Sequence, residues 1–230
     1  MEPRFHGVAF DLDHTLLVDN RLEHIALLDM LVHIDGERFP LHLSLDLAGE
    51  IAEEELARFR HGQQDVDELL ERFVERCGAR DGRSWAAWFE ARCLASVATF
   101  VLPMPGASRT FERLTSAGIA LAALSNGPSP LQERKAAQIG FHAPVLASGA
   151  IGARKPDPRA FAQLAAQLAL PPERIAYVGD DPHGDIGGAL AAGMAAIWFD
   201  GSGTPYPADA PPPTARITAL DELFELCVRA

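Results

Sequence analysis

Short apolar runs alternate with amphipathic stretches in the C-terminal part of the chain. Apolar runs that predict β-strands cover residues 119–124, 145–147, 175–178 and 195–199. Apolar residues recur at helical spacing near residues 108–117, 131–139, 159–168 and 185–192. Strands that alternate with helices form parallel βαβ units, so we expect an α/β fold with a doubly wound, mostly parallel sheet.

Both ends of the sequence contribute to this predicted sheet. Val8, Ala9 and Phe10 form an apolar run that reads as a buried strand. Near the other end, residues 201–214 ("GSGTPYPADAPPPT") predict a proline-rich loop. Residues 215–218 then predict a last edge strand, and residues 220–230 a closing helix.

A charged, helical segment separates the first strand from the others. The stretches "LEHIALLDMLVHI", "AGEIAEEELARF", "DVDELLERFVERC" and "SWAAWFEARCLASVATF" all carry apolar residues at i, i+3 and i+4, and we see no convincing strand there. We therefore predict a Rossmann-like core of residues 1–16 and 99–230, with an α-helical cap of residues 17–98 inserted into it.

Composition fits a globular protein and limits its partners. The 230 residues are 48% hydrophobic and 23% charged, which suits one large domain or a domain with an insertion. The formal net charge of -12 argues against binding to nucleic acid or to an anionic membrane surface. No apolar run approaches the roughly 18 residues that a membrane-spanning helix needs.

Cysteine usage and the first residues suggest a reducing compartment. Cys77, Cys93 and Cys227 are odd in number and have no CxxC spacing, so they imply neither a disulfide framework nor a zinc site. The stretch "MEPRFHG" has no apolar signal core. We expect a cytoplasmic setting.

Two aspartates follow the first strand with one residue between them. Asp11 and Asp13 should share a face or an edge, because a strand points alternate residues to the same side. Two carboxylates about 4 Å apart repel each other by roughly 4 kcal/mol at a surface-like dielectric. Such a pair needs a cation, a chemical role, or both.

Polar residues also follow the other predicted strands. Ser125-Asn126-Gly127 ends one strand, Lys155 precedes a helix in "ARKPDP", and "GDDPHGD" brings Asp180, Asp181 and Asp185 after another. Taken singly, each has a structural explanation as a turn, a solvated surface lysine or a helix N-cap. Ligands bind at the carboxyl ends of the strands in doubly wound sheets, so their joint occurrence favours a metal-phosphate site.

The four motifs DxDxT, a strand-terminal Ser, Lys-Pro and GDxxxxD, in this order, resemble the haloacid dehalogenase superfamily. They span residues 11–185, and the helical insertion resembles the C1-type cap of subfamily I. The segment "YVGDDPHGDIGGALAAGMAAIWFDGSG" is similar to small-molecule phosphatases of that subfamily. The resemblance implies a Mg²⁺-dependent phosphomonoester hydrolase that acts on a small phosphorylated metabolite through an aspartyl-phosphate.

Chemistry and resemblance together suggest roles for these residues. Asp11 serves as the nucleophile, and Asp13 protonates the leaving group and then activates water. Mg²⁺ prefers oxygen ligands, and the implied set is Asp11, the Asp13 carbonyl and Asp180, with Asp185 or, less favoured, Asp181 behind them. The remaining predicted site residues contact phosphate or shape the motif: Lys155, Ser125, Asn126 and Thr15.

Several alternatives share this scaffold. A dehalogenase or a phosphonatase lacks the second aspartate of DxDxT, so Asp13 argues against both. A phosphomutase keeps it and stays open, and a non-catalytic protein that binds phosphate ligands would be expected to lose Asp11, Asp13 or Lys155. A sugar phosphate, a nucleoside monophosphate and a phosphoglycolate-like acid all remain open as substrates. Candidate substrate contacts in the cap are Arg58, Arg60, His61 and Arg72.

Overall fold

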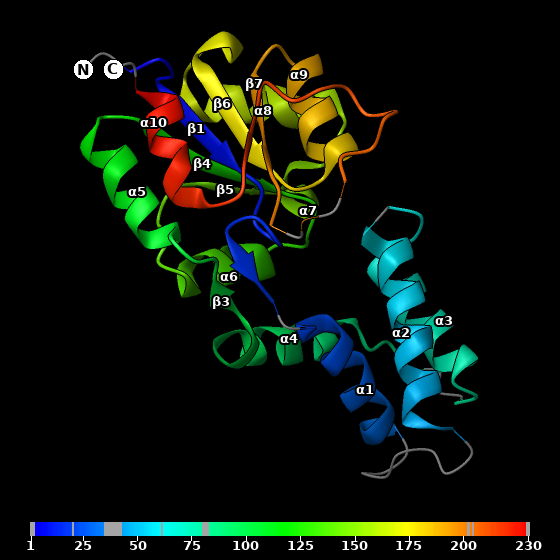
Figure 1. The fold of residues 1–230 in the computed structure, drawn as a ribbon. Helices are drawn as coiled ribbons and strands as arrows, with labels where there is room; N and C mark the ends of the chain where they lie inside the picture. Colours follow the sequence, from blue (N-terminus) through cyan, green and yellow to red (C-terminus); the bar gives the residue numbers. More distant parts are fainter. Residues whose placement is uncertain are drawn as a thin grey trace. The chain divides into compact units, whose positions relative to one another are not determined.

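The computed structural model describes residues 3–19, 21–34, 43–60, 62–79, 83–201, 203 and 205–228. The chain divides into two compact units (Figure 1). Residues 1–19 and 101–230 form the first unit, and residues 20–100 form the second.

The first unit is built on a six-stranded sheet with the order β5-β4-β1-β6-β7-β8. Its neighbouring strands all pair in parallel, and β8 forms one edge. The bounds are β1 (Gly7–Phe10), β4 (Ala120–Ser125), β5 (Val145–Ala147), β6 (Ile175–Gly179), β7 (Ala195–Phe199) and β8 (Ala215–Ile217). The predicted α/β class and the doubly wound parallel sheet are confirmed.

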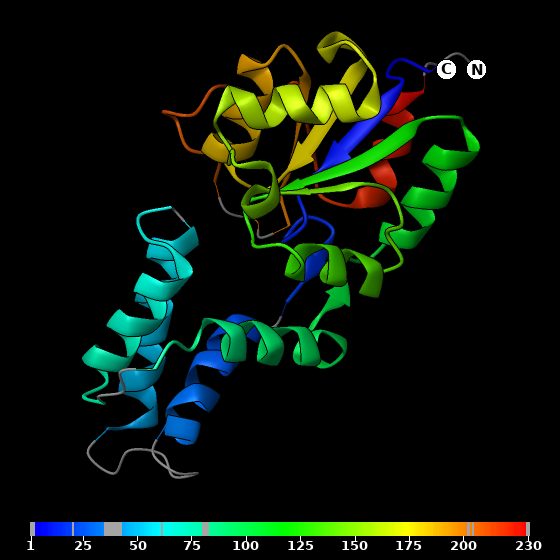
Figure 2. The same cartoon turned by 180° about the vertical axis from the view of Figure 1, so that it is seen from behind.

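Helices cover both faces of this sheet because successive strand residues point to opposite sides. Ala9 belongs to the core cluster that includes Phe161 of α8 (Pro158–Leu168), and Figure 2 shows α8 in front of the sheet. Phe10, the next residue, packs edge-to-face against Phe111 of α5 (Ala107–Ser116). Figure 1 shows α5 on that opposite side, beside α10 (Leu223–Cys227).

Short elements complete the first unit. They are β2 (Leu17–Val18), β3 (Leu102–Pro103), α6 (Leu131–Gln138), α7 (Ser148–Ile151), α9 (Gly188–Ala191) and two 3₁₀ turns, Pro172–Arg174 and Leu220–Glu222. The strands β2 and β3 pair antiparallel, so the chain leaves and re-enters this unit at adjacent positions. The sequence analysis did not predict β2, β3 or α7, because two to four residues display no periodic pattern.

A helix is present over most of the predicted residues 185–192, but it begins earlier and its first part is of another type. Residues Pro182–Gly187 form a π-helix, and only Gly188–Ala191 is α-helical. Asp181 is the N-cap and its carboxylate accepts a hydrogen bond from the His183 N–H at 2.9 Å. Asp185, which read as a possible N-cap from the sequence alone, lies inside the π-helix.

The second unit is helical in its described residues, as predicted. It contains α1 (Leu22–Ile34), α2 (Leu45–Arg60), α3 (Val66–Arg76) and α4 (Ala86–Phe100). Glu55 on α2 is fully buried and accepts hydrogen bonds from Arg72 and Arg76 on α3. This ion-paired carboxylate joins the two helices.

The arginines considered as substrate contacts have partners inside this unit. Arg58 donates to Gln64, Arg60 donates to Glu23 at 2.9 Å, and Arg72 donates to Glu55 at 3.0 Å. The fourth candidate, His61, lies outside the described residues. The three described arginines thus have structural roles within the helical unit, where each bonds to another of its residues.

No helix in the described part of the chain is long and apolar enough to cross a membrane. Cys77, Cys93 and Cys227 are buried, and none of the three forms a disulfide within the described part of the chain.

Candidate active site

The order of the strands brings the predicted site residues together. Because β4, β1 and β6 are adjacent and parallel, their carboxyl ends meet at one edge of the sheet. Asp11 follows β1, Ser125 ends β4 and Asp180 follows β6. Ser125 is 2% exposed and Asp11 is 6% exposed, so both are held inside this edge.

A buried lysine links two of the carboxylates. Lys155 donates to Asp11 Oδ1 at 2.5 Å and to Asp185 Oδ1 at 2.7 Å. Asp185 Oδ2 also accepts the Asp181 N–H at 3.1 Å, and the Tyr177 hydroxyl lies 3.2 Å from Asp185 Oδ1. Asp185 therefore orients Lys155 toward Asp11. Sequence reasoning missed Tyr177, because it reads as one apolar residue of a buried strand.

Glycine at position 179 makes room for this arrangement. A Cβ there would lie 2.3 Å from Asp185 Oδ2, so any side chain would displace the carboxylate. The π-helix also contributes to this arrangement, since it carries Asp185 back toward the end of β6.

Asn126 supports Lys155 through its backbone. The Asn126 side chain donates to the Lys155 carbonyl at 2.9 Å and accepts the Lys155 N–H at 2.7 Å. This two-way pairing fixes the loop that carries Lys155 against the end of β4. Asn126 was predicted to contact phosphate through an amide, and its side-chain amide is engaged with the backbone of Lys155.

Asp11, Asp180 and Asp185 form a candidate metal centre. Each offers one carboxylate oxygen, and the three oxygens lie within 4.8 Å of one another. The Thr15 hydroxyl donates to Asp180 Oδ1 at 3.3 Å, and Trp198 Nε1 donates to the Asp180 carbonyl at 3.0 Å. Of the two acids left open by the sequence, Asp185 lies in this cluster.

The electrostatics of the cluster fit a divalent cation. Burial, followed by repulsion from Asp185, raises the pKa of Asp180 from its ordinary 3.8 to about 6. Burial also raises the pKa of Asp11, where Lys155 opposes the shift and the neighbouring carboxylates add to it. Although burial alone would lower it, Asp11 and Asp185 raise the pKa of Lys155. The negative charge therefore exceeds what Lys155 offsets, and the donors are the hard oxygens that Mg²⁺ prefers.

Asp13 lies beside a second buried lysine. Lys135 on α6 is 1% exposed and donates to Asp13 Oδ1 and to Asp19 Oδ2, both at 3.0 Å. Lys135 was not among the site residues predicted from the sequence. A signal was present, because the lysine recurs at helical spacing with Leu131 and Ile139 on the side of the helix that is buried.

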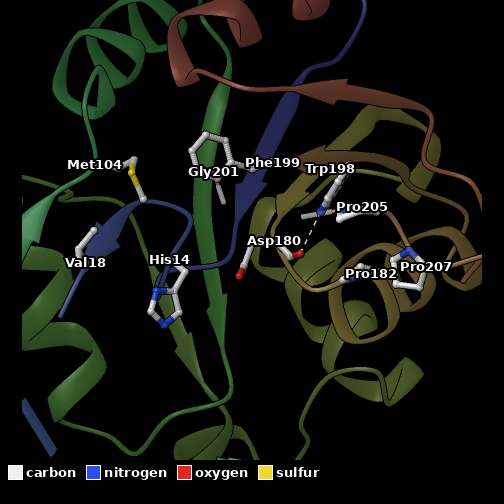
Figure 3. A pocket seen from close by; sticks show the side chains of 10 residues that line it. All are labelled: His14, Val18, Met104, Asp180, Pro182, Trp198, Phe199, Gly201, Pro205 and Pro207. Atoms are coloured by element: carbon white, nitrogen blue, oxygen red, sulfur yellow. Dashed lines mark hydrogen bonds between the residues drawn. The ribbon is translucent and has the colours of Figure 1, made fainter. Parts of the chain in front are cut away.

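A cavity of about 490 Å³ adjoins Asp180 (Figure 3). Trp198, Phe199 and three prolines make up half of its ten lining residues, and His14 and Asp180 are its ionisable groups. His14 has a positive φ of 64°, a conformation that glycine adopts more readily. The lining residues are His14, Val18, Met104, Asp180, Pro182, Trp198, Phe199, Gly201, Pro205 and Pro207.

Fold and site together define a class of α/β protein in which a buried carboxylate, paired with lysine at the carboxyl edge of a parallel sheet, is placed to react. Residues 5–193 match the haloacid dehalogenase-like hydrolases, and the chain belongs to that family. The family indicated by the four motifs is confirmed, and the protein is a hydrolase of this family.

Three known proteins illustrate the breadth of the family. A glyceraldehyde 3-phosphate phosphatase from Methanopyrus kandleri is 28% identical over 83% of this chain and 82% of its own length. A phosphoserine phosphatase from Thermus thermophilus is 40% identical, but the match covers only 46% of this chain and 44% of that protein. The crystal structure of a 2-haloacid dehalogenase from Pseudomonas syringae superposes with a TM-score of 0.71, at 26% identity, over 96% of this chain and 97% of the other.

Proposed function

We propose that the protein is a Mg²⁺-dependent phosphomonoester hydrolase that acts on a small phosphorylated metabolite through an aspartyl-phosphate. One observation carries the proposal. A buried Asp11, paired with Lys155, lies within the Asp180 and Asp185 cluster, and a second carboxyl group at Asp13 follows two residues later. The phosphatases among the relatives support the same reaction class.

The reaction takes place in two displacements. The Asp11 carboxylate attacks phosphorus, the bond from phosphorus to the ester oxygen breaks, and Asp13 gives its proton to the leaving alcohol. Asp13 then takes a proton from a water molecule, whose oxygen attacks the same phosphorus. Phosphate leaves and the Asp11 carboxylate is restored.

The other residues bind the phosphate and hold the reacting groups. Lys155 offsets the charge of the phosphate and of Asp11. The Ser125 hydroxyl and the backbone N–H of Asn126 donate to phosphate oxygens, while Thr15 orients Asp180. Mg²⁺ would be held by Asp11, Asp180 and the Asp13 carbonyl, with Asp185 behind them, and when bound it neutralises charge on the phosphate.

Dehalogenation is the second candidate, and the structural likeness to a haloacid dehalogenase favours it. In that reaction Asp11 would attack carbon, the carbon–halogen bond would break with release of halide, and water would hydrolyse the resulting ester to an alcohol and restore Asp11. Asp13 has no task in such a reaction. Its presence beside Asp11 therefore favours the phosphatase.

Release of phosphate from p-nitrophenyl phosphate tests the proposal. We expect release with Mg²⁺, none with EDTA, and a loss of at least about a thousandfold in Asp11→Asn. Asp181→Asn is the matched control, because an asparagine keeps the N-cap of the π-helix and Asp181 lies outside the carboxylate cluster.

Chloroacetate separates the two candidates in the same preparation. The proposal expects no chloride release. Chloride release without phosphate release would establish the dehalogenase, and phosphate release that survives in Asp11→Asn would remove Asp11 as the nucleophile.

A further inference from the structure

Helix α6 directs a charged side chain into the interior of the first unit. Lys135 is 1% exposed and lies on the buried face that also carries Leu131 and Ala136. Burying an ammonium group is unfavourable unless it is paired and hydrogen-bonded. The carboxylates of Asp13 and Asp19 provide that pairing, each at 3.0 Å.

These two carboxylates differ in their surroundings. The side chain of Asp19, which directly follows β2, is 11% exposed, whereas that of Asp13 is 31% exposed. One carboxylate is sufficient to balance one ammonium charge. The second bond, to Asp13, therefore achieves something other than neutralising Lys135: it restrains a partly exposed carboxyl group beside Asp11.

The same face of α6 supports a second part of the site. Gln132, one turn before Lys135, is also 1% exposed. It packs against Gly127 so closely that a Cβ at Gly127 would lie 1.9 Å from Gln132 Nε2. Two buried polar side chains thus connect α6 to the loops that follow β1 and β4, where the reacting groups lie.

We propose that Lys135 is a positioning residue that holds the Asp13 carboxyl group for proton transfer to the leaving alcohol, and that Asp19 anchors Lys135. The inference rests on the proposed function, in which Asp13 is the acid. A general acid acts only within hydrogen-bonding reach of the oxygen that it protonates. Restraining the group in advance reduces the entropy lost when that geometry forms.

The dependence of rate on the leaving group tests this inference. The ratio kcat/KM covers the steps up to departure of the alcohol. p-Nitrophenolate is a weak base and departs without a proton, whereas phenolate and 4-methylphenolate gain more from protonation. In Lys135→Met we expect kcat/KM to fall about tenfold or more for phenyl and 4-methylphenyl phosphate, but within about threefold for p-nitrophenyl phosphate.

Two further variants keep the test decisive. Asp19→Asn loosens the anchor of Lys135 but keeps its contact with Asp13, so it should lower kcat/KM by a smaller factor that is again larger for phenyl and 4-methylphenyl phosphate than for p-nitrophenyl phosphate. Lys135→Met combined with Asp19→Asn removes the ammonium group and the charge of its Asp19 partner together. It replaces the single variant if that variant does not fold, as judged by circular dichroism, and it should show the same selective loss.

An equal loss for the three esters, or no loss, in the lysine variants would overturn the inference, since a structural role alone does not depend on the leaving group. A wild-type protein with no Mg²⁺-dependent release from any of the esters would instead overturn the proposed function.

Discussion

At the scale of single residues, the site is a set of negative charges that the protein itself offsets only in part. Lys155 pairs with Asp11 and Asp185, and Lys135 pairs with Asp13 and Asp19. Asp180 has no such ammonium partner among its described contacts, and its pKa is raised to about 6. The carboxylate cluster thus costs stability in the absence of a cation.

Asp180→Asn should therefore stabilise the metal-free protein at pH 8. A carboxyl whose pKa rises on folding contributes most below its unfolded value of 3.8, and its contribution is lost as pH rises through about 6. The difference between a pKa of 3.8 and one of about 6 corresponds to about 3 kcal/mol, which we expect as the upper limit of the gain. Thermal unfolding in EDTA at pH 8 and at pH 4 measures it, and the gain should disappear at pH 4.

With saturating Mg²⁺ the wild type should be more stable than Asp180→Asn, because the variant lacks one metal ligand while the wild type gains binding energy. Asp181→Asn, outside the cluster, should respond to Mg²⁺ as the wild type does. If Mg²⁺ stabilised wild type and Asp180→Asn equally, Asp180 would not be a ligand.

At the scale of elements, the hydrophobic pattern predicted the strands better than the details of the site. β5 and β7 begin and end at the residues predicted, because each is a short apolar run that ends at a polar residue, Ser148 and Asp200 respectively. The sequence pattern predicted an ordinary helix from residue 185 and did not indicate the π-helix of residues 182–187. There Asp185 bonds to Lys155, thirty positions earlier in the sequence.

The individual residues of the site could be predicted from the sequence, but the contacts between them could not. Asp11, Ser125, Lys155 and Asp180 stand out because each follows a strand or precedes a helix. Lys135 did not, since a lysine on an amphipathic helix is usually solvated. Its burial depends on Asp13 and Asp19, which are more than a hundred residues away along the chain.

Among the polar residues of the helical unit, we expect substitution of Glu55 to reduce stability the most. Burial alone would raise its pKa, but hydrogen bonds from Arg72, Arg76 and Gln64 lower it from 4.5 to about 2. Glu55→Gln leaves these donors without their carboxylate, and we expect it to reduce the free energy of unfolding by about 1–3 kcal/mol at pH 7. Urea denaturation measures this change.

Acid should erase the difference between wild type and Glu55→Gln. The contribution of a carboxylate with a lowered pKa is present above about 4.5 and is lost as pH falls toward 2. Glu54→Gln is the matched control, since Glu54 is 63% exposed and pairs with Arg76 alone in the described contacts. An equal effect of both substitutions would show that burial of Glu55 adds nothing.

At the scale of the whole molecule, the antiparallel pair of β2 and β3 marks where the helical unit enters and leaves the first unit. Val18 pairs with Leu102, so the two chain ends that flank the helical unit are adjacent. A chain in which a short Asn-Gly turn replaces residues 20–100 can therefore close without rearranging the sheet.

We expect this shortened chain to bind inorganic phosphate and to lose its ranking among phosphate esters. All the proposed phosphate-binding residues belong to the first unit, whereas we assign selection of the leaving group to the helical unit. Phosphate binding by calorimetry and kcat/KM over a panel of sugar phosphates, nucleotides and phosphoglycolate measure the two properties. An unchanged ranking would show that the helical unit does not select the substrate.

The most direct test of the account is to trap the phosphorylated enzyme. The protein is mixed with p-nitrophenyl phosphate and Mg²⁺, quenched during the first turnover, treated with borohydride and mapped by mass spectrometry. Borohydride reduces an aspartyl-phosphate to homoserine, so we predict homoserine at position 11 only when ester and Mg²⁺ are both present. Phosphate release over the same interval, with an unmodified Asp11 at every quench time, would contradict the account.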